Sequence, residues 1–193
     1  SDLVAYVLSF DPTVATPVFT TVVSFPLNYE RESVGGGGTG AWLPWKSTWV
    51  VDGPGVDSMD GQNKRPGQPV VGDIEFDSNG DMVIGLLDRF SHQTGSKNYR
   101  AISGTTDTNH SGLSNGDILK ACKSGAVWII EGAPGGCVDN DTAPYASGGQ
   151  KTNDGPSNVG EFFYGDYHLN ASNNLDHEEI TQGGLAFLPG SGE

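Results

Sequence analysis

The stretch from residue 72 to residue 90, GDIEFDSNGDMVIGLLDRF, constrains the fold more than any other part of the chain. Apolar and polar residues alternate on both sides of an Asn79-Gly80 pair. Alternation with a period of two is typical of a half-buried strand, and Asn-Gly between two such runs favours a two-residue type I′ turn. The stretch therefore predicts a β-hairpin. The side chains expected to pack are Ile74, Phe76, Met82, Ile84 and Leu86.

Other strand-like runs precede and follow this hairpin. Residues 3–10 and 17–27 are rich in β-branched and aromatic residues and are separated by a Pro-bounded turn, which predicts two strands. Residues 116–122 and 125–131, GDILKAC and GAVWIIE, predict a second hairpin. With 29 glycines and 11 prolines, the composition suits a turn-rich β protein better than a helical bundle.

The whole chain is predicted to be one all-β domain, residues 1–193. Strand pairs fall into blocks of about 1–51, 70–116, 117–160 and 161–193, separated by long Gly/Asn/Asp-rich loops. A spacing of roughly forty residues is that of propeller blades. We therefore expect a β-propeller-like fold or multi-blade antiparallel sheets, either as a closed ring or as an incomplete one whose last block continues outside the chain.

The charge of the chain limits its partners. Asp and Glu number 24 against 10 Lys and Arg, a formal net charge of -14, and such acidity opposes binding to nucleic acid. No run approaches the roughly 18 apolar residues of a membrane span, so no membrane insertion is expected. Hard oxygen ligands are those that calcium selects, which makes calcium the expected ion.

The acids of the first hairpin are the candidate metal ligands. They are Asp73, Glu75, Asp77, Asp81 and Asp88. The spacing of Asp77, Asn79 and Asp81 is similar to that of a calcium loop, but Met82 stands where an EF-hand needs glycine, so calcium here requires another geometry. The alternative is that these carboxylates only solvate one face of a sheet.

Candidate ligand-binding residues come from the acids, one arginine and the tryptophans. They are Asp73, Glu75, Arg89, Glu179, Trp42 and Trp45. An alignment of Ile74 with Ile180 sets Asp73 opposite Glu179, which would turn both acids toward a shared channel. The tryptophans of AWLPWKSTWVV either pack in the core or form a sugar-binding platform. Arg89 either pairs with an inward acid or recognises a ligand.

The two cysteines indicate an oxidising compartment. Cys122 and Cys137 flank a strand and a turn that can fold back, so a disulfide is expected; two unpaired thiols are the alternative. Sequons at Asn109, Asn140 and Asn170 lie in polar, loop-like stretches where glycans can be attached. Together these features favour an extracellular location, secreted or at the cell surface.

Several segments in this order carry a family resemblance: DIEFDSNGDMVIGLLDRFSHQTG, GDILKAC, GEFFYGDY and HEEITQGGLAFLPGSGE, with SFPLNYER and WLPW nearer the start. The chain resembles a propeller-like region of large bacterial secreted or surface proteins that often carry Cna-B-like (SdrD-B-like) repeat modules. The resemblance implies an extracellular location and a propeller-like architecture, and it implies no known catalytic residues.

No catalytic motif is apparent in the sequence. HEEI lacks the second histidine of a zinc site, and no Gly-x-Ser-x-Gly elbow is present. We therefore predict a non-catalytic structural or adhesive surface module of a bacterium, whose partners are other copies, other domains of the same protein, or glycans. One alternative is a subunit of a self-assembling extracellular fibre that pairs through the edge strands LVAYVLSF or GGLAFLPG. Another is a carbohydrate-binding module or a glycoside hydrolase using paired carboxylates such as Asp73, Glu75 and Glu179.

Overall fold

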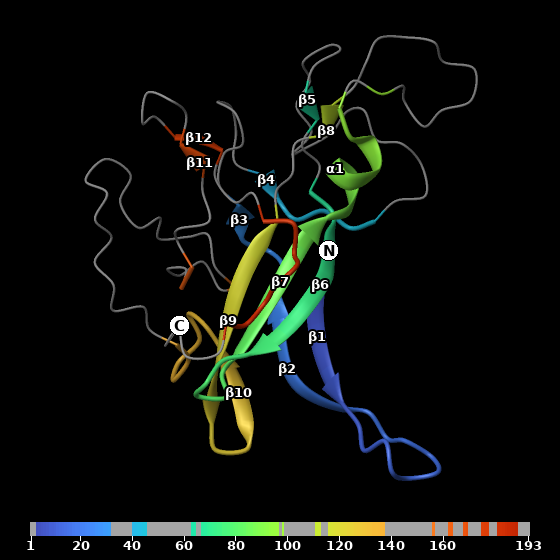
Figure 1. Cartoon of the computed structure of the whole chain (residues 1–193), viewed down its shortest axis with the longest axis vertical. Coiled ribbons are helices and arrows are strands. Elements are labelled where there is room, and N and C mark those ends of the chain that lie inside the picture. Colours follow the sequence, from blue (N-terminus) through green and yellow to red (C-terminus); the bar gives the residue numbers. More distant parts are fainter. Residues whose placement is uncertain are drawn as a thin grey trace.

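The fold is mostly β, in two layers (Figure 1). The computed structural model describes residues 3–31, 40–45, 63–64, 67–96, 98, 111–112, 116–137, 156, 162–163, 168–169, 175–177 and 181–188. The elements are β1 (Val4–Ser9), β2 (Thr20–Pro26), β3 (Glu30–Arg31), β4 (Gly40–Ala41), β5 (Asn63–Lys64), β6 (Pro69–Phe76), β7 (Met82–Asp88), α1 (Arg89–Thr94), β8 (Ser111–Gly112), β9 (Asp117–Ser124), β10 (Val127–Ile130), β11 (His168–Leu169) and β12 (Leu175–His177).

The main layer is a four-stranded antiparallel sheet in the order β10-β9-β7-β6. The central strand β7 (MVIGLLD) pairs with β6 on one side and with β9 on the other. Its alternate side chains Met82, Ile84 and Leu86 are buried on one face, as the period of two predicts. This confirms both predicted hairpins, and it joins the strand pairs of two expected blocks, 70–116 and 117–160, in a single sheet.

The second layer is the β1–β2 hairpin, which packs on the inner face of the four-stranded sheet. Its register shifts once, between Val7 and Leu8. The shared core combines side chains from both layers: Ala5, Val7, Val23, Phe25, Leu27, Tyr29, Trp42, Met82, Ile84, Leu86, Leu119, Ala121 and Ile130. Burying such side chains contributes roughly 1.5–3 kcal/mol each for the larger ones, which makes this core the main source of stability.

The outer face of the sheet is crossed by residues 181–188, which we call the crossing segment. A Cβ added at Gly85 would lie 2.4 Å from the carbonyl oxygen of Gly183, and one added at Gly116 would lie 2.0 Å from that of Thr181. Figure 1 draws this segment as a red trace over β7. It is not a strand, so the prediction that GGLAFLPG offers a free edge strand is wrong: glycines on the sheet let its backbone lie flat against the outer face.

Local details differ from expectation in two places. The hairpin turn is centred on Ser78 and Asn79, because the N–H of Gly80 bonds to the carbonyl of Asp77 at 3.0 Å, and Gly80 takes a positive φ of 79°. The turn therefore lies one residue earlier than a type I′ turn at Asn79-Gly80. Phe76, expected in the core, is about half exposed and lies with its ring 5.9 Å from that of Trp128.

The described part of the chain contains a single helix, α1, which follows β7 directly and which the sequence did not predict. Asp88 caps its N-terminus by accepting a bond from the N–H of Phe90, and Gly95 ends it at positive φ. In the part of the chain that the structure describes, no helix is long and apolar enough to cross a membrane. The described sheets establish an all-β fold, and neither a closed ring of blades nor a barrel is found among them.

Candidate functional site

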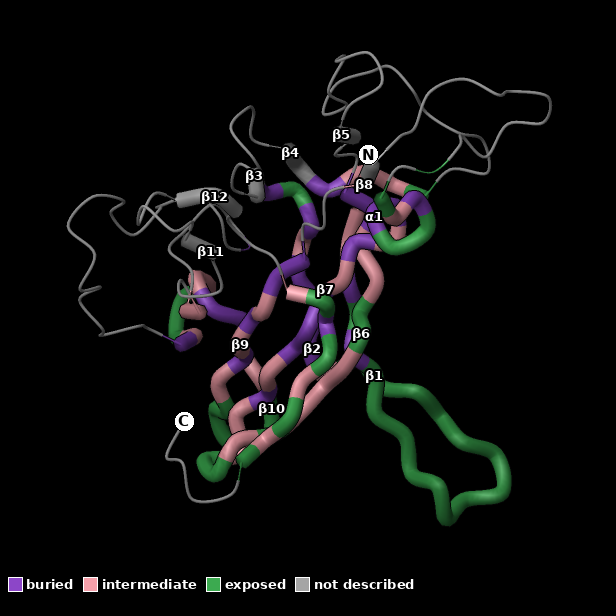
Figure 2. Tube along the Cα trace, turned by 45° about the horizontal axis from the view of Figure 1, so that its top comes forward, coloured by how far each residue is buried: buried purple, intermediate pink, exposed green. Residues whose placement is uncertain are grey.

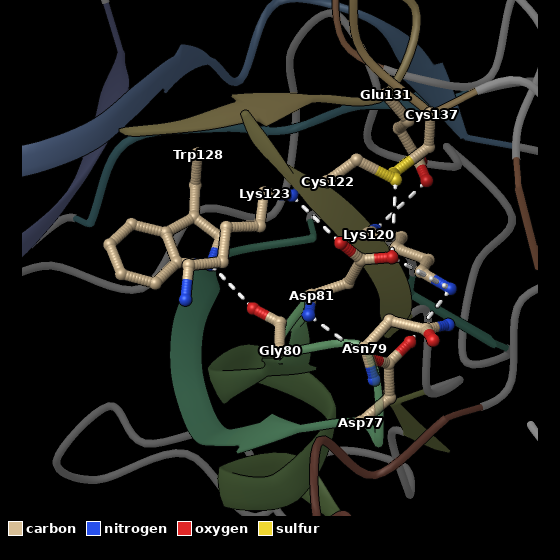
Figure 3. Close-up of a disulfide and its surroundings, with 10 residues drawn as sticks. All are labelled: Asp77, Asn79, Gly80, Asp81, Lys120, Cys122, Lys123, Trp128, Glu131 and Cys137. Carbon is tan, nitrogen blue, oxygen red and sulfur yellow. Dashed lines mark hydrogen bonds and ion pairs between the residues drawn. A yellow bond between two sulfur atoms is a disulfide. The ribbon is translucent and has the colours of Figure 1, made fainter. Parts of the chain in front are cut away.

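The densest polar cluster lies where the tip of the β6–β7 hairpin meets β9 (Figure 3). The Nζ atom of Lys120 lies 3.0 Å from Oδ2 of Asp77 and 3.6 Å from Oδ2 of Asp81. All three side chains are largely buried, with 12%, 6% and 14% of their surface exposed. The ammonium group also lies 4.3 Å from the ring centre of Phe162. One buried lysine thus neutralises part of the charge of two acids.

Asp77 also organises the turn. Its Oδ1 accepts bonds from the backbone N–H groups of Asn79 and Asp81, at 2.8 and 2.9 Å. Burial alone would raise the pKa of Asp77, but the hydrogen bond and charge of Lys120 and these two N–H groups together hold it below its usual value. The ionised form of Asp77 is therefore the one that the folded state stabilises.

The predicted disulfide is present beside this cluster. Cys122 in β9 is bonded to Cys137, with their Cα atoms 5.2 Å apart, within the usual range for a disulfide. The Cys122 sulfur lies 3.5 Å from Oδ2 of Asp81; a disulfide sulfur carries no proton, so this is a contact and not a hydrogen bond. Oδ1 of Asp81 accepts the N–H of Lys123 at 2.7 Å.

One further contact ties the same hairpin tip to β10, and two more hold β9 to β10 and to the loop after it. The indole N–H of Trp128 donates to the carbonyl of Gly80 at 2.9 Å, and the ammonium of Lys123 lies 5.8 Å from the Trp128 ring. Oε2 of the buried Glu131 accepts the N–H of Lys120 at 2.9 Å. The arrangement therefore fastens two hairpins and the loop after β10 to one another. These ion pairs and hydrogen bonds have a structural role, because each joins one element of the fold to another.

The predicted metal ligands do not converge within the described residues. Asp77 and Asp81 hold the Lys120 ammonium where a cation would bind, Asp88 caps α1, and Asp73 with Glu75 lies on the outer face of β6. Among the residues that the structure describes, no group of three or more His, Cys, Asp or Glu side chains is placed to hold a metal ion. Calcium binding stays a prediction.

Asp73 and Asp88 each hold a separate piece of backbone. Oδ2 of Asp73 accepts the N–H of Leu185 at 3.2 Å, which fixes the crossing segment to β6. Oδ1 of the fully buried Asp88 accepts the N–H of Gln68 at 2.9 Å as well as that of Phe90. Both acids thus have structural partners. Asp73 lies on the face of β6 that points away from the inter-sheet core.

The two described tryptophans of the predicted platform behave differently. Trp42 is 4% exposed and belongs to the core, which agrees with the core-packing alternative. Trp45 is 58% exposed; its indole N–H donates to the carbonyl of Pro69, and the Arg89 guanidinium lies 4.8 Å from its ring centre. Nη1 of Arg89 donates to Oε1 of Gln68. Arg89 therefore has local partners at the base of α1, a role nearer to the structural alternative.

Sequence reasoning missed the buried pair of Tyr29 and Asp117. The Tyr29 hydroxyl donates to Oδ2 of Asp117, and both residues are 0% exposed. A signal was available, because Asp117 shares strand parity with Leu119 and Ala121, which face the core. Its partner lies 88 residues away in sequence, and no local pattern points to it.

Four predicted residues lie outside the described residues: Glu179, Asn109, Asn140 and Asn170. The predicted facing of Asp73 and Glu179, and the three glycosylation sites, are therefore left as predictions. The disulfide, by contrast, is confirmed.

Fold and site together define a disulfide-bonded, two-layer all-β domain whose polar cluster is built for cohesion. No family model matches the chain, and no solved structure matches it. The chain is similar to Colossin-A of Dictyostelium discoideum, with 35% identity over 169 residues. The match covers 84% of this chain and 1% of that protein. This relative comes from a eukaryote, and the resemblance to bacterial surface proteins stays a prediction.

Proposed function

We propose that the chain is a non-catalytic structural module of a large extracellular protein. The observation that carries this proposal is the Cys122–Cys137 disulfide, which lies beside the Lys120 ion pairs. Disulfides persist in oxidising compartments and are rare in the cytosol. The bond ties β9 to the loop after β10, and the ion pairs tie β9 to the tip of the β6–β7 hairpin. This arrangement is suited to a domain that keeps its shape outside the cell.

The similarity to Colossin-A supports the modular part of the proposal. A unit of this size that matches 84% of the chain occupies 1% of that protein, so comparable units can form small parts of very long chains. The propeller-like architecture, the bacterial source and the adhesive role are carried by the sequence resemblance alone. The acids Asp73, Asp77, Asp81, Asp88, Asp117 and Glu131 hold backbone N–H groups, a lysine or a tyrosine, which favours a structural role over a catalytic one.

The redox state of the native protein tests the location. Cells of the source organism are lysed in the presence of a thiol-alkylating reagent, and the peptides holding Cys122 and Cys137 are measured by mass spectrometry. We expect both peptides without alkylation until a reductant is added, together with a loss of mass on deglycosylation if Asn109, Asn140 or Asn170 carries glycans. Alkylated, reduced cysteines in the native protein would overturn the extracellular assignment.

The non-catalytic part has its own test. Purified protein is incubated with a panel of polysaccharides, and reducing ends are measured. Hydrolysis that disappears in Asp73→Asn or Glu75→Gln would replace the structural role with the glycoside hydrolase alternative. The same two variants test the predicted calcium site. An ion held by these acids raises the Tm of the wild type and not that of the double variant, and an unchanged Tm in both would contradict calcium binding by Asp73 and Glu75.

Assembly of copies through edge strands is the second candidate, and the β1–β2 hairpin favours it. Tyr6 and Leu8 of β1 are exposed apolar side chains on a two-stranded sheet. Open sheet edges recruit strands from other chains.

A further inference from the structure

The end of the β1–β2 hairpin extends away from the two-layer body as an exposed arm. We define the hairpin arm as residues 8–21, every one of which is exposed. Figure 2 shows it as a green loop projecting from β1. The hairpin arm lies beyond the edge of the core. Packing inside this chain therefore does not account for the apolar side chains of the arm. Exposed apolar groups that gather on one projection mark an interaction surface.

The hairpin arm is apolar at its tip. Phe10 and Phe19 are 51% and 62% exposed, and their ring centres lie 5.2 Å apart. Val18 is 73% exposed. Asp11, the arm's single charge, is turned back on the chain, because its Oδ1 accepts both the N–H and the hydroxyl of Thr13 at 2.8 and 2.7 Å. The tip therefore presents two aromatic rings and aliphatic groups with little competing charge.

The strand beneath the tip has an unguarded edge. β1 (VAYVLS) contains neither the lysine nor the proline that usually protects an edge strand. In the described part of the chain β1 pairs with β2 alone, so one edge of β1 has no strand beside it. Tyr6 and Leu8 lie exposed along this strand at 60% and 50%. Backbone and side chains thus offer one continuous surface from β1 to the arm tip.

The distribution of charge indicates which partner binds the hairpin arm. The chain carries a net charge of -14, so two copies repel one another over most of their surface. Residues 3–29 contain Asp11 as their only charged residue, so two copies can meet through this region with little repulsion. A basic partner, in contrast, would find its complementary charge elsewhere on the molecule.

The exposed area is enough for a weak pair. Six side chains contribute to it: Tyr6, Leu8, Phe10, Val14, Val18 and Phe19. At their exposed fractions they present about 600 Å² per copy, given about 150–250 Å² for each whole aromatic side chain. Two copies then bury about 1,200 Å², the lower bound for specific protein interfaces. We infer that the hairpin arm and the edge of β1 form a twofold interface with a second copy of this chain.

This interface rests on the proposed structural role and gives it a partner. A twofold axis sets the same patch of both copies face to face, and antiparallel pairing of β1 with β1 would extend two two-stranded hairpins into one four-stranded sheet. Pro12 and Pro17 fix φ within the arm. A stiffened arm loses less conformational entropy on binding.

Sedimentation velocity of the intact, oxidised protein tests the inference. Over about 1 to 500 µM, a range suited to a weak specific dimer, we expect the mass to rise from 20.2 kDa toward twice that value. Added salt should strengthen the dimer, since it screens the repulsion between copies and leaves apolar contact intact. The double variant Val18→Asp/Phe19→Asp should weaken association about tenfold or more, because like charges then meet across the axis.

Matched controls distinguish association through the hairpin arm from nonspecific association of exposed apolar side chains. Leu188→Asp removes an equally exposed apolar side chain, 71% exposed, outside the arm, and it should dimerise like the wild type. Val18→Cys should form a disulfide-linked dimer on mild oxidation, while Val127→Cys, 53% exposed beside the turn of the β9–β10 hairpin, should not. Equal Tm values confirm that every variant folds.

Three results would overturn the interface. One is a wild type that stays at 20.2 kDa over the whole range. Another is equal weakening by Leu188→Asp. The third is a monomer that co-sediments with phosphatidylcholine vesicles through the arm, which would assign the rings to a lipid surface. Any of these, with the disulfide intact, leaves the proposed structural role standing, because that role is tested by redox state and not by association.

Discussion

Removal of the Cys122–Cys137 disulfide is expected to lower the free energy of unfolding by about 3 kcal/mol. The two cysteines are 15 residues apart in sequence, and a closed loop of that length restricts the unfolded chain by about 3 kcal/mol at 25 °C. For a chain of 193 residues, each kcal/mol moves Tm by about 2–4 °C, so we expect a fall of about 6–12 °C. Circular dichroism melts of the wild type and of Cys122→Ala/Cys137→Ala measure it.

The matched control is the wild type melted with a reductant, which breaks the same bond without changing a side chain's bulk. The reduced wild type and the double variant should melt within a few degrees of one another, and the reductant should leave the variant unchanged. Cys137 is buried. If Tm falls further in the double variant than in the reduced wild type, the difference measures the packing lost with the cysteine side chains. A Tm unmoved by reduction would refute the reasoning, because closing the loop between β9 and Cys137 would then add nothing to stability.

Other perturbations follow from single contacts. Gly85→Ala should cost about 1–3 kcal/mol in urea melts, since its Cβ would lie 2.4 Å from a carbonyl of the crossing segment, whereas Gly184→Ala meets nothing within 4 Å and should be silent. Asp77→Asn keeps an acceptor for the turn and loses the charge facing Lys120. It should cost about 1–2 kcal/mol at neutral pH. Because the folded pKa of Asp77 is lowered, that stability is present above its ordinary value of 3.8 and is lost as pH falls below it, so wild type and variant should converge in acid melts; a constant gap would contradict the ion pair. Arg89→Ala should cost about 1 kcal/mol through its lost hydrogen bond and ring contact, and an unchanged melting curve would argue against a structural role.

The strands were predictable because their signals are local. Alternation in residues 72–90 and in GDILKAC and GAVWIIE marked strands that the structure contains. The Asn-Gly pair placed the turn within one residue. The disulfide followed from two cysteines on either side of a strand and a turn. Each of these signals is carried by neighbouring residues, whose spacing alone decides the geometry.

What the sequence left hidden is non-local. Nothing near β7 announces that β9 is its partner, so two expected blocks proved to be one sheet. Lys120 was assigned to a strand, but its place between two acids of another hairpin depends on that same pairing. Glycine is unfavourable inside a strand, although the missing side chain of Gly85 is what admits the crossing segment. Three-dimensional neighbours of this kind cannot be derived from periodicity.

The crossing segment also sets the order in which this domain can mature. Its contact with Gly116 comes from Thr181, and Leu185 bonds to Asp73, 112 residues earlier. Ribosomes add about 5–20 residues per second, so roughly 3–10 s pass between the synthesis of Ile130, where β10 ends, and that of the crossing segment. During that interval the four strands are already present while the outer face of their sheet is bare. Distant contacts of this kind slow folding, and the nascent domain therefore depends on a late-arriving stretch of chain to shield its own backbone.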